Sequence, residues 1–521
     1  MKISLIAGLV TLGLMAGCAP TDQYAKAPEG TQVNKVSIEN LVAHDKSVIA
    51  ANSIKAVDSA QLKNQLLNLA DGAELIIEPG KYADLGRLSI TANNVVIKAK
   101  EPGKTWFTGL VQLNLMGNNI TIDGVVFSEG GPAERMGGIT FRGNNNTLQN
   151  STFFFFNDKY AYEPDRKRDE YPKYLWLSLY GKNNQLLNNT FEGKHKRGTL
   201  IGIQKAKGDE TADNHLIKGN LFYDQKHNRY EEFEISDAIR YNSNSWEAIR
   251  VGDSKSSIFP SKTTIEGNLF YECDGETELV SLKSGENVLR GNTVINSASM
   301  ISIRHGVNNL VEDNVIIGNG KRYSGGIRLY DEGQIIRNNY IERVMGTGNV
   351  RGGIAINTGI TDVQNGERLS TEVKGKGLNK QATPNKVIVE NNTVINSRQN
   401  ILYSDKKHRV SLYDNTKVST VFAAVDTQFR NNLSYATIKK TLAVKGNDEV
   451  AKLVNPTYEN EVYFGELQNV DLSSFNGVST QEPELKVAEN GLLEAVDLNV
   501  GAKGLKVLTM ADVGASYTIQ K

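Results

Sequence analysis

The sequence predicts an all-β chain, folded as a single-stranded parallel β-helix with a short N-terminal capping helix and a C-terminal extension. Three observations lead to this prediction: a repeat of 22 to 25 residues, short strands of alternating apolar side chains, and Asn or Gly at the turn of each repeat. The 521 residues include 48 glycines but only 11 prolines, which suits tight, repeated turns better than long linkers. The ordinary share of hydrophobic residues, 39%, excludes a disordered chain.

The charge of the chain is balanced. Its 59 Lys and Arg residues equal its 59 Asp and Glu residues, so the formal net charge is zero. Such a chain has no overall field to attract nucleic acid or an anionic membrane. We therefore expect no nucleic-acid partner, and any site for a polyanion must be local.

The first residues resemble a bacterial lipoprotein signal peptide, predicted over residues 1–17. A basic Lys2 precedes an apolar run over residues 3–15, which is too short for a membrane span, and residues 14–18 resemble a lipobox. We expect export in a bacterium and a lipid anchor on Cys18 at the outer membrane, on its periplasmic side or at the cell surface. The alternative is a plain secretory signal with an incidental cysteine. Cys273 would then be the one remaining thiol, expected in the core.

A polar linker over residues 18–56 leads to a predicted amphipathic helix over residues 59–69. Its leucines are spaced to share one face, and Ser59 could act as the N-cap. This helix would cover the open end of the first coil and protect its unpaired strand edge.

The repeat joins an apolar pair, a polar-Asn step and a second apolar pair. Asn268, Asn292, Asn314 and Asn339 are 24, 22 and 25 residues apart, and longer steps elsewhere indicate loop insertions. Stacked coils would share one core, and their asparagines would form a ladder of paired amides. A leucine-rich repeat would need regular leucines and a helix in each unit, which are absent. We assign residues 57–444 to the β-helix and residues 445–521 to an extension that packs on it.

Alignment of the repeats predicts a column of cationic side chains on one face. Lys283 and Arg304 are 21 residues apart, one coil in the same register. The same alignment adds five further residues to this column: Arg142, Tyr180, Gln204, Arg250 and Arg328. Stacked like charges are unfavourable without a counter-charge or a ligand. The alternative is that these side chains are solvated and pair with nearby acids.

An acidic segment precedes Lys283. Glu276 and Glu278 are two residues apart, so on a strand they point to the same side. With a third oxygen ligand they would suit Ca²⁺, whereas six unclustered histidines argue against zinc.

Cations beside a calcium site suit β-elimination in a uronic acid polysaccharide. A base removes the C5 proton, an acid protonates the departing O4, and a bound cation neutralises the adjacent carboxylate. Lysine can serve as the base. Arginine normally keeps its proton, so a water or a tyrosine could share the role of acid.

Three stretches, residues 244–255, 273–287 and 303–306, resemble polysaccharide lyase family 6 and occur in the order found in that family. The family contains alginate lyases and chondroitinase B. The resemblance implies a right-handed helix, Lys283 as Brønsted base and Arg304 as acid. It also implies calcium ligands at Asn244, Glu276 and Glu278, with Asn242 a rival because the family's Asn-Gly-Gly-Glu reads Asn-Ser-Trp-Glu here. Four residues are proposed as contacts of the anionic polysaccharide: Arg250, His305, Arg328 and Tyr330.

Alginate is the leading substrate, because Gly306 after His305 and the phrases Gly-Asp-Ser-Lys and Ser-Gly-Glu-Asn resemble the alginate branch. A dermatan sulfate lyase would need further cations for sulfates, in the loop over residues 194–205 or at Arg322. A non-catalytic carbohydrate-binding β-helix is the third alternative, and it would not need both Lys283 and Arg304.

Overall fold

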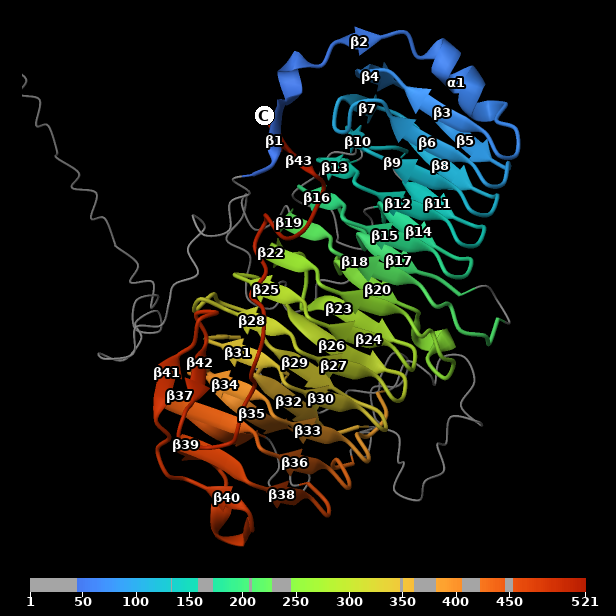
Figure 1. Ribbon diagram of the computed structural model, residues 1–521. Helices are drawn as coiled ribbons and strands as arrows, with labels where there is room; N and C mark the ends of the chain where they lie inside the picture. Colours follow the sequence, from blue (N-terminus) through green and yellow to red (C-terminus); the bar gives the residue numbers. More distant parts are fainter. Residues whose placement is uncertain are drawn as a thin grey trace, which may run out of the picture.

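The computed structural model describes residues 45–132, 134–157, 172–205, 209–226, 245–346, 350–359, 381–404, 422–445 and 453–521. Its strands stack into a long parallel β-helix, which confirms the predicted fold (Figure 1). A complete coil contributes a strand to each of three stacks, here called sheets 1, 2 and 3, and the coils at the two ends are incomplete. Sheets 1 and 2 are joined through the long strand β37, which pairs with both β34 and β35.

Sheet 1 comprises β2 (Ala56–Val57), β4 (Gly80–Ala83), β7 (Thr105–Thr108), β10 (Val125–Ser128), β13 (Thr152–Phe154), β16 (Thr190–Glu192), β19 (Leu221–Lys226), β22 (Leu269–Asp274), β25 (Thr293–Ile295), β28 (Val315–Ile317), β31 (Tyr340–Glu342), β34 (Thr393–Ile395), β37 (Leu433–Lys445), β39 (Glu461–Gln468) and β40 (Val478–Ser479). Sheet 2 comprises β5 (Gly86–Ile90), β8 (Val111–Leu115), β11 (Ile139–Phe141), β14 (Leu177–Leu179), β17 (Ile201–Ile203), β20 (Ile249–Val251), β23 (Glu278–Lys283), β26 (Met300–His305), β29 (Ile327–Leu329), β32 (Ile354–Asn357) and β35 (Gln399–Ser404). Sheet 3 comprises β3 (Glu74–Ile77), β6 (Val96–Ala99), β9 (Thr121–Asp123), β12 (Thr147–Gln149), β15 (Gln185–Leu187), β18 (Leu216–Lys218), β21 (Thr264–Glu266), β24 (Val288–Arg290), β27 (Leu310–Glu312), β30 (Ile335–Arg337), β33 (Ile388–Glu390), β36 (Gln428–Arg430) and β38 (Thr457–Glu459). Short 3-10 helices cover Ala51–Ser53, Ser254–Ser256 and Leu472–Ser474.

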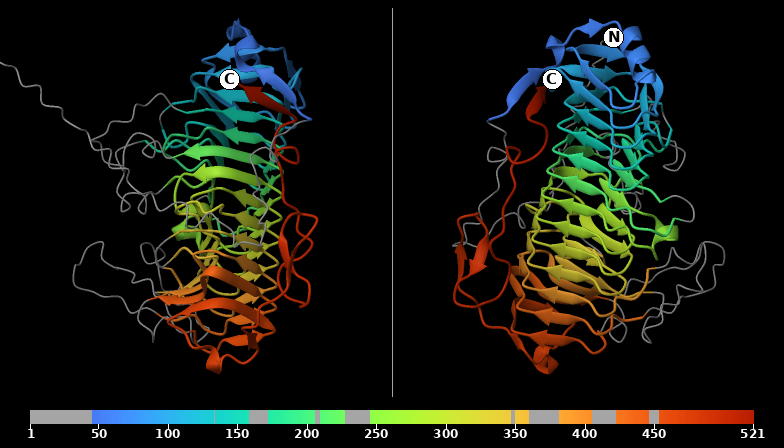
Figure 2. Two further views of the ribbon diagram at one scale, coloured as in Figure 1. Left: turned by 90° about the vertical axis from the view of Figure 1, so that its left-hand side faces the viewer. Right: turned by 45° about the vertical axis from the view of Figure 1, so that its right-hand side comes forward.

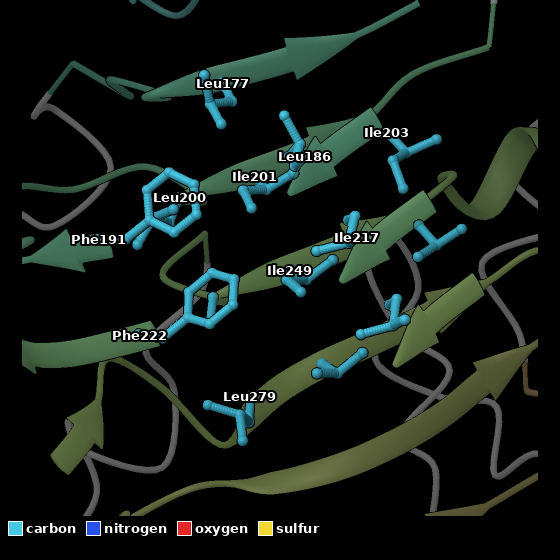
Figure 3. Packing of buried hydrophobic residues seen from close by; sticks show 14 of the residues in the cluster. Leu177, Leu186, Phe191, Leu200, Ile201, Ile203, Ile217, Phe222, Ile249 and Leu279 are labelled. Atoms are coloured by element: carbon cyan, nitrogen blue, oxygen red, sulfur yellow. The ribbon is translucent and has the colours of Figure 1, made fainter. Parts of the chain in front are cut away.

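The core runs along the inside of the coils. Equivalent apolar residues lie above one another, as Leu177, Ile201 and Ile249 do in sheet 2 (Figure 3). Phe191 and Phe222 stack in the same way on sheet 1, with ring centroids 5.0 Å apart. No single coil could bury these side chains alone, so adjacent coils stabilise one another.

The predicted asparagine ladder is confirmed at the turn from sheet 3 to sheet 1. Each buried amide donates from Nδ2 to Oδ1 of the next asparagine at 2.9 to 3.0 Å, through Asn189, Asn220, Asn268, Asn292, Asn314, Asn339, Asn392 and Asn432. The residue before each rung has a positive φ, as at Asn188 (52°) and Gly291 (59°), which is why Asn, Asp and Gly recur there. The ladder ends on Glu461, whose Oε1 accepts from Asn432 at 2.9 Å.

The helix α1 (Ala60–Leu67) lies over the first coils, where the capping helix was predicted. Leu62 and Leu66 are buried in the core, whereas Leu67 is 51% exposed and lies off the expected face. Ser59 occupies the N-cap position without a capping side-chain bond, and Asp58 accepts from the backbone N–H of Ala60 instead. In the part of the chain that the structure describes, no helix is long and apolar enough to cross a membrane.

The stacked strands continue beyond Val444 to β40, and residues 480–521 then run back along sheet 1 (Figure 2). This returning segment contains the hairpin β41 (Leu485–Val487) and β42 (Leu493–Ala495). Its final strand, β43 (Tyr517–Gln520), pairs in parallel with β1 (Ser47–Ala50). The backbone of the returning segment donates hydrogen bonds to Thr393, Thr293 and Thr190 at 2.8, 2.9 and 3.1 Å. Each of these threonines directly follows an asparagine of the ladder, so the same turn of successive coils binds the segment.

Glu461 makes stability depend on pH. Burial raises its pKa from 4.5 to about 7, against hydrogen bonds from Asn432. The folded chain therefore holds a proton that the unfolded chain releases at about pH 4.5. Stability should fall by about 3 kcal/mol as pH rises from 4.5 through 7, and Glu461→Gln should remove this component. Urea unfolding at several pH values measures it, with the exposed Glu459→Gln as control. Parallel pH profiles for the wild type and Glu461→Gln would contradict the assignment.

Candidate active site

The candidate site lies on the outer face of sheet 2, over β20, β23, β26 and β29. Alternation along each strand points every second side chain outward, and pairing of adjacent coils aligns these side chains across strands. Arg250 of β20 pairs with Ser281 of β23, then Ser302 of β26 and Arg328 of β29.

The single cationic column expected from the sequence is wrong in detail. Arg250 and Arg328 share the position of Ser281, two residues before Lys283. A β-bulge between Leu282 and Lys283 also shifts the register, so that Lys283 pairs with His305 rather than with Arg304. The cations therefore occupy two adjacent outward columns, because an irregular strand does not keep the register that a count of residues implies.

Three carboxylates meet beneath these cations. Glu247, Glu276 and Glu278 are all buried and each offers an oxygen within 4.8 Å of the others. Glu247 was not assigned a role from the sequence, although it ends the quoted Asn-Ser-Trp-Glu motif. Its Oε2 accepts from Thr199 at 2.7 Å, a contact from another coil that no local pattern reveals.

Two of the carboxylates have cationic partners. Lys283 Nζ lies 3.3 Å from Glu247 Oε1 and 3.9 Å from Glu278 Oε2. Arg304 Nη1 lies 3.3 Å from Glu278 Oε1, and Arg328 binds the same oxygen. Arg328 also donates to Ser302 Oγ, which orients its guanidinium. The structure thus brings together Lys283, Arg304 and Arg328 with both predicted glutamates.

The pKa values of the three carboxyls diverge. Burial alone would raise the pKa of Glu278, but Arg304, Lys283 and Arg328 outweigh it and hold that pKa well below its usual range. In Glu247, Lys283 and Arg250 likewise overcome burial and lower the pKa. The pKa of Glu276 is instead well above its usual range, because of burial and the charges of Glu247 and Glu278. Within the described residues Glu276 has no ion-pair partner.

The donor set fits a hard cation. Carboxylate oxygens are the ligands that Ca²⁺ prefers. A bound cation would favour the ionised form of Glu276, which burial and the two neighbouring carboxylates disfavour. Asn244, the predicted third ligand, and its rival Asn242 lie outside the described residues. Glu247 is therefore a further candidate ligand that the fold supplies.

The remaining predicted residues surround this centre. Arg250 Nη2 lies 3.4 Å from Gln204 Oε1, towards the N-terminal coils. His305 is buried, and its Nε2 lies 3.4 Å from Ser254 Oγ. Tyr330 is fully buried, with its ring 5.7 Å from the guanidinium carbon of Arg328, and burial raises its pKa. Their roles in substrate binding stay predictions.

Cys273 is buried, as expected, and Cys18 lies outside the described residues.

The two glutamates of the Glu-Thr-Glu segment should differ in their effect on stability. Glu278→Gln leaves Arg304 and Arg328 without their buried counter-charge and should cost about 3–5 kcal/mol. Glu276→Gln replaces a carboxyl that has no ion-pair partner among the described residues and should leave metal-free stability equal or higher. Urea unfolding in excess chelator measures both variants. Equal losses in the two variants would contradict this electrostatic picture.

Comparison with known proteins agrees with the geometry. The family model described as Chondroitinase B matches residues 56–500. Among curated proteins, none matches the chain significantly.

Solved structures include two similar chains over nearly their full length. One is described as a new PL6 alginate lyase in complex with a trisaccharide; it is 45% identical, and the match covers 94% of this chain and 99% of that one, with a TM-score of 0.82. The other, the alginate lyase AlyF-OU02 in complex with G6, is 46% identical with the same coverage and a TM-score of 0.83. The PL6 alginate lyase AlyGC, 22% identical over 89% of this chain and 58% of that one, shares the fold with a TM-score of 0.70. The chain is a polysaccharide lyase and belongs to polysaccharide lyase family 6, the family of chondroitinase B.

Proposed function

We propose that the protein cleaves alginate by calcium-assisted β-elimination and leaves 4,5-unsaturated uronate ends. The observation that carries this proposal is the site on sheet 2, where Lys283, Arg304 and Arg328 pair with two of three clustered, buried carboxylates. Both similar chains, at 45% and 46% identity, are alginate lyases in complex with oligosaccharides, which supports a uronate polymer as the substrate.

In the proposed reaction the C5–H bond and the bond from C4 to O4 break, and a C4=C5 double bond forms. Lys283, in its unprotonated form, takes the C5 proton, and the Glu247 carboxylate, 3.3 Å away, stabilises the ammonium charge that Lys283 gains. Glu278 raises the pKa of Arg304, so this guanidinium stays charged and acts as a strong hydrogen-bond donor to the departing O4. Because Arg304 keeps its proton, the proton that O4 gains comes from a water or from Tyr330, and Arg304 stabilises the negative charge that develops on O4.

Glu276, Glu278 and either Asn244 or Glu247 would hold the calcium ion. When bound, calcium would supply positive charge against the substrate carboxylate and so increase the acidity of C5. Arg328, which is held by its bonds to Glu278 and Ser302, would donate hydrogen bonds to the substrate carboxylate and so orient it.

Dermatan sulfate is less favoured. Lys194 is fully buried, and Lys205 forms an ion pair with Asp213 at 3.1 Å. Two of the four Lys and Arg residues in this loop are thus engaged inside the protein.

Incubation with alginate, and separately with dermatan sulfate, tests the function through ultraviolet absorbance of the unsaturated product. We expect product from alginate. Lys283→Ala should lower turnover about 10²–10⁴-fold while far-ultraviolet circular dichroism is unchanged, since a positioned base contributes about this factor. Lys262→Ala, an exposed lysine paired with Glu286, is the matched control. No product from either polymer would contradict the lyase proposal.

Exhaustive chelation should suppress turnover, and added Ca²⁺ should restore it, because the developing charge would otherwise lack its counter-ion. Full activity after chelation would reject the calcium role and leave the rest of the mechanism standing.

We also propose that the protein is exported and anchored by a lipid on Cys18. Cys18→Ala should move it from the membrane fraction to the soluble fraction of a bacterial host. Retention in the membrane fraction would contradict the anchor.

A further inference from the structure

A second cationic cluster lies on the N-terminal side of the catalytic residues. Gln204, directly after β17, accepts through Oε1 from Arg135 Nη2 and from Arg250 Nη2, each at 3.4 Å. Strands in a sheet are about 4.8 Å apart, so β17 lies roughly 10 Å from β23, two strands away. This cluster is therefore close to Lys283 but separate from it.

Gly202 shapes the cluster. It pairs with Arg250, and a Cβ at Gly202 would lie 2.6 Å from Gln204 Nε2. The amide of Gln204 thus lies against bare backbone, where any other residue would displace it. The two arginines hold Oε1 and thereby determine which way the donor end of the amide points.

Two donors in this cluster lack an acceptor. Gln204 Nε2 and Arg250 Nε are buried and have no hydrogen-bond partner in the described part of the chain. Gln204 as a whole is only 7% exposed, so water has little access to its amide. Buried donors without acceptors are costly, so native proteins rarely retain them without a reason. A bound oxygen anion would supply the missing acceptors after a small side-chain movement.

The charge of this cluster is not compensated as it is at the catalytic centre. Lys283, Arg304 and Arg328 each have a carboxylate partner, but neither Arg135 nor Arg250 has one within ion-pair distance among the described residues. The pKa of the nearby Lys173 reflects the same excess of positive charge. Burial lowers its pKa, and Arg197, Arg135 and Arg250 lower it further, with Glu247 opposing them. Uncompensated cations in a partly buried site favour an anionic ligand.

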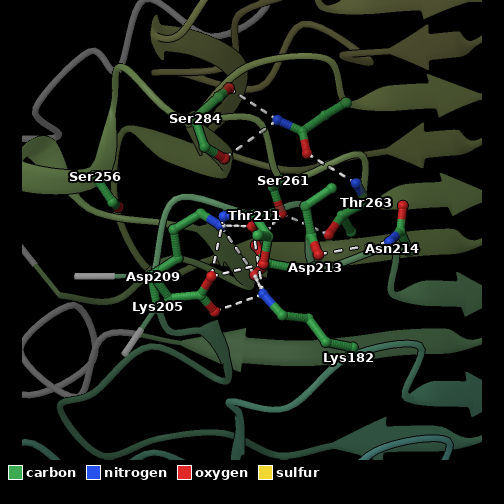
Figure 4. A network of polar contacts seen from close by, with 12 residues as sticks. Lys182, Lys205, Asp209, Thr211, Asp213, Asn214, Ser256, Ser261, Thr263 and Ser284 are labelled. Carbon is green, nitrogen blue, oxygen red and sulfur yellow. Dashed lines mark hydrogen bonds and ion pairs between the residues drawn. The ribbon is translucent and has the colours of Figure 1, made fainter. Parts of the chain in front are cut away.

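An ion-pair network anchors the segment that carries Gln204. The next residue, Lys205, is almost fully buried and pairs with Asp213 at 3.1 Å, and Lys182 pairs with Asp209 at 2.5 Å (Figure 4). Ser261 also donates to Asp213 at 2.6 Å. The network attaches this segment to the neighbouring coil, so Gln204 is positioned before any ligand binds.

We propose that Arg135, Gln204 and Arg250 form a subsite that binds a uronate carboxylate of the polysaccharide, next to the sugar that reacts at Lys283. Lys173 adds long-range attraction to the same anion. The subsite rests on the proposed function, since a uronate polymer carries one carboxylate on every sugar. Its residues position the chain and take no part in proton transfer.

Gln204→Glu tests the subsite, because it places a carboxylate of the same shape between the two arginines. The substituted side chain should occupy the subsite from within, which stabilises the fold but repels the substrate. In an inactive Lys283→Ala parent, calorimetry with a purified six-sugar oligouronate from alginate should show binding at least about tenfold weaker. The melting temperature should be unchanged or higher. Gln481→Glu, at an exposed position on the returning segment, is the matched control.

Arg135→Ala supplies a second measurement in the active enzyme. We expect KM for alginate to rise about five- to fiftyfold with kcat within about threefold, because the residue acts on binding alone. The control is Arg290→Ala, on sheet 3, where the arginine is paired with Glu266.

The outcomes separate this subsite from the proposed function. A wild type that cleaves alginate, with Gln204→Glu affinity unchanged within twofold, overturns the subsite alone. A lower melting temperature together with weaker binding of Gln204→Glu also overturns it, because it indicates misfolding rather than occupation. A wild type that releases no product from alginate overturns the proposed function itself.

Discussion

Everything in this protein depends on the hydrogen-bonded stacking of parallel coils. Each strand pairs with its equivalent one coil away, and the asparagine ladder repeats that pairing at the turn. The ladder satisfies amides that would otherwise be buried without partners. Loops of different length can therefore leave the stack without disturbing the register. The step from Asn292 to Asn314 spans 22 residues and that from Asn339 to Asn392 spans 53, yet the same bond forms at both.

This regular frame allows charges to be buried at close range. Three carboxylates within 4.8 Å of one another would be unfavourable in a flexible chain, but here strands in register hold cations against them. Removal of charges from water is costly, and only good geometry compensates for it. The candidate site thus carries a pre-arranged balance of charge, in which Glu276 is the carboxyl without an ion-pair partner among the described residues. That carboxyl is the feature which suits a cation cofactor.

The charge along the outer face of sheet 2 is asymmetric. Around Lys283 the cations are matched by acids, whereas Arg135 and Arg250 towards the N-terminal coils have no acidic partner within ion-pair distance among the residues that the structure describes. Beyond Arg328 the equivalent outward positions are Ala355, Leu402 and Ala443, all buried and apolar. In this column, the positive charge therefore lies on the N-terminal side of Lys283. In the proposed function this asymmetry would draw an anionic polymer to that side, although the whole chain is neutral.

The sequence by itself determined the β-helix, the asparagine ladder and the identity of Lys283, Arg304, Glu276 and Glu278 as one group, because these follow from local periodicity and the short motif they occupy. Only the tertiary structure decided the bulge that pairs Lys283 with His305, the inclusion of Glu247, and the return of residues 480–521 along sheet 1. The same holds for Gln204 between Arg135 and Arg250. Each of these depends on contacts between coils or between chain segments far apart. Periodicity predicts which face a side chain occupies, but the neighbour it meets there depends on insertions and bulges in other coils.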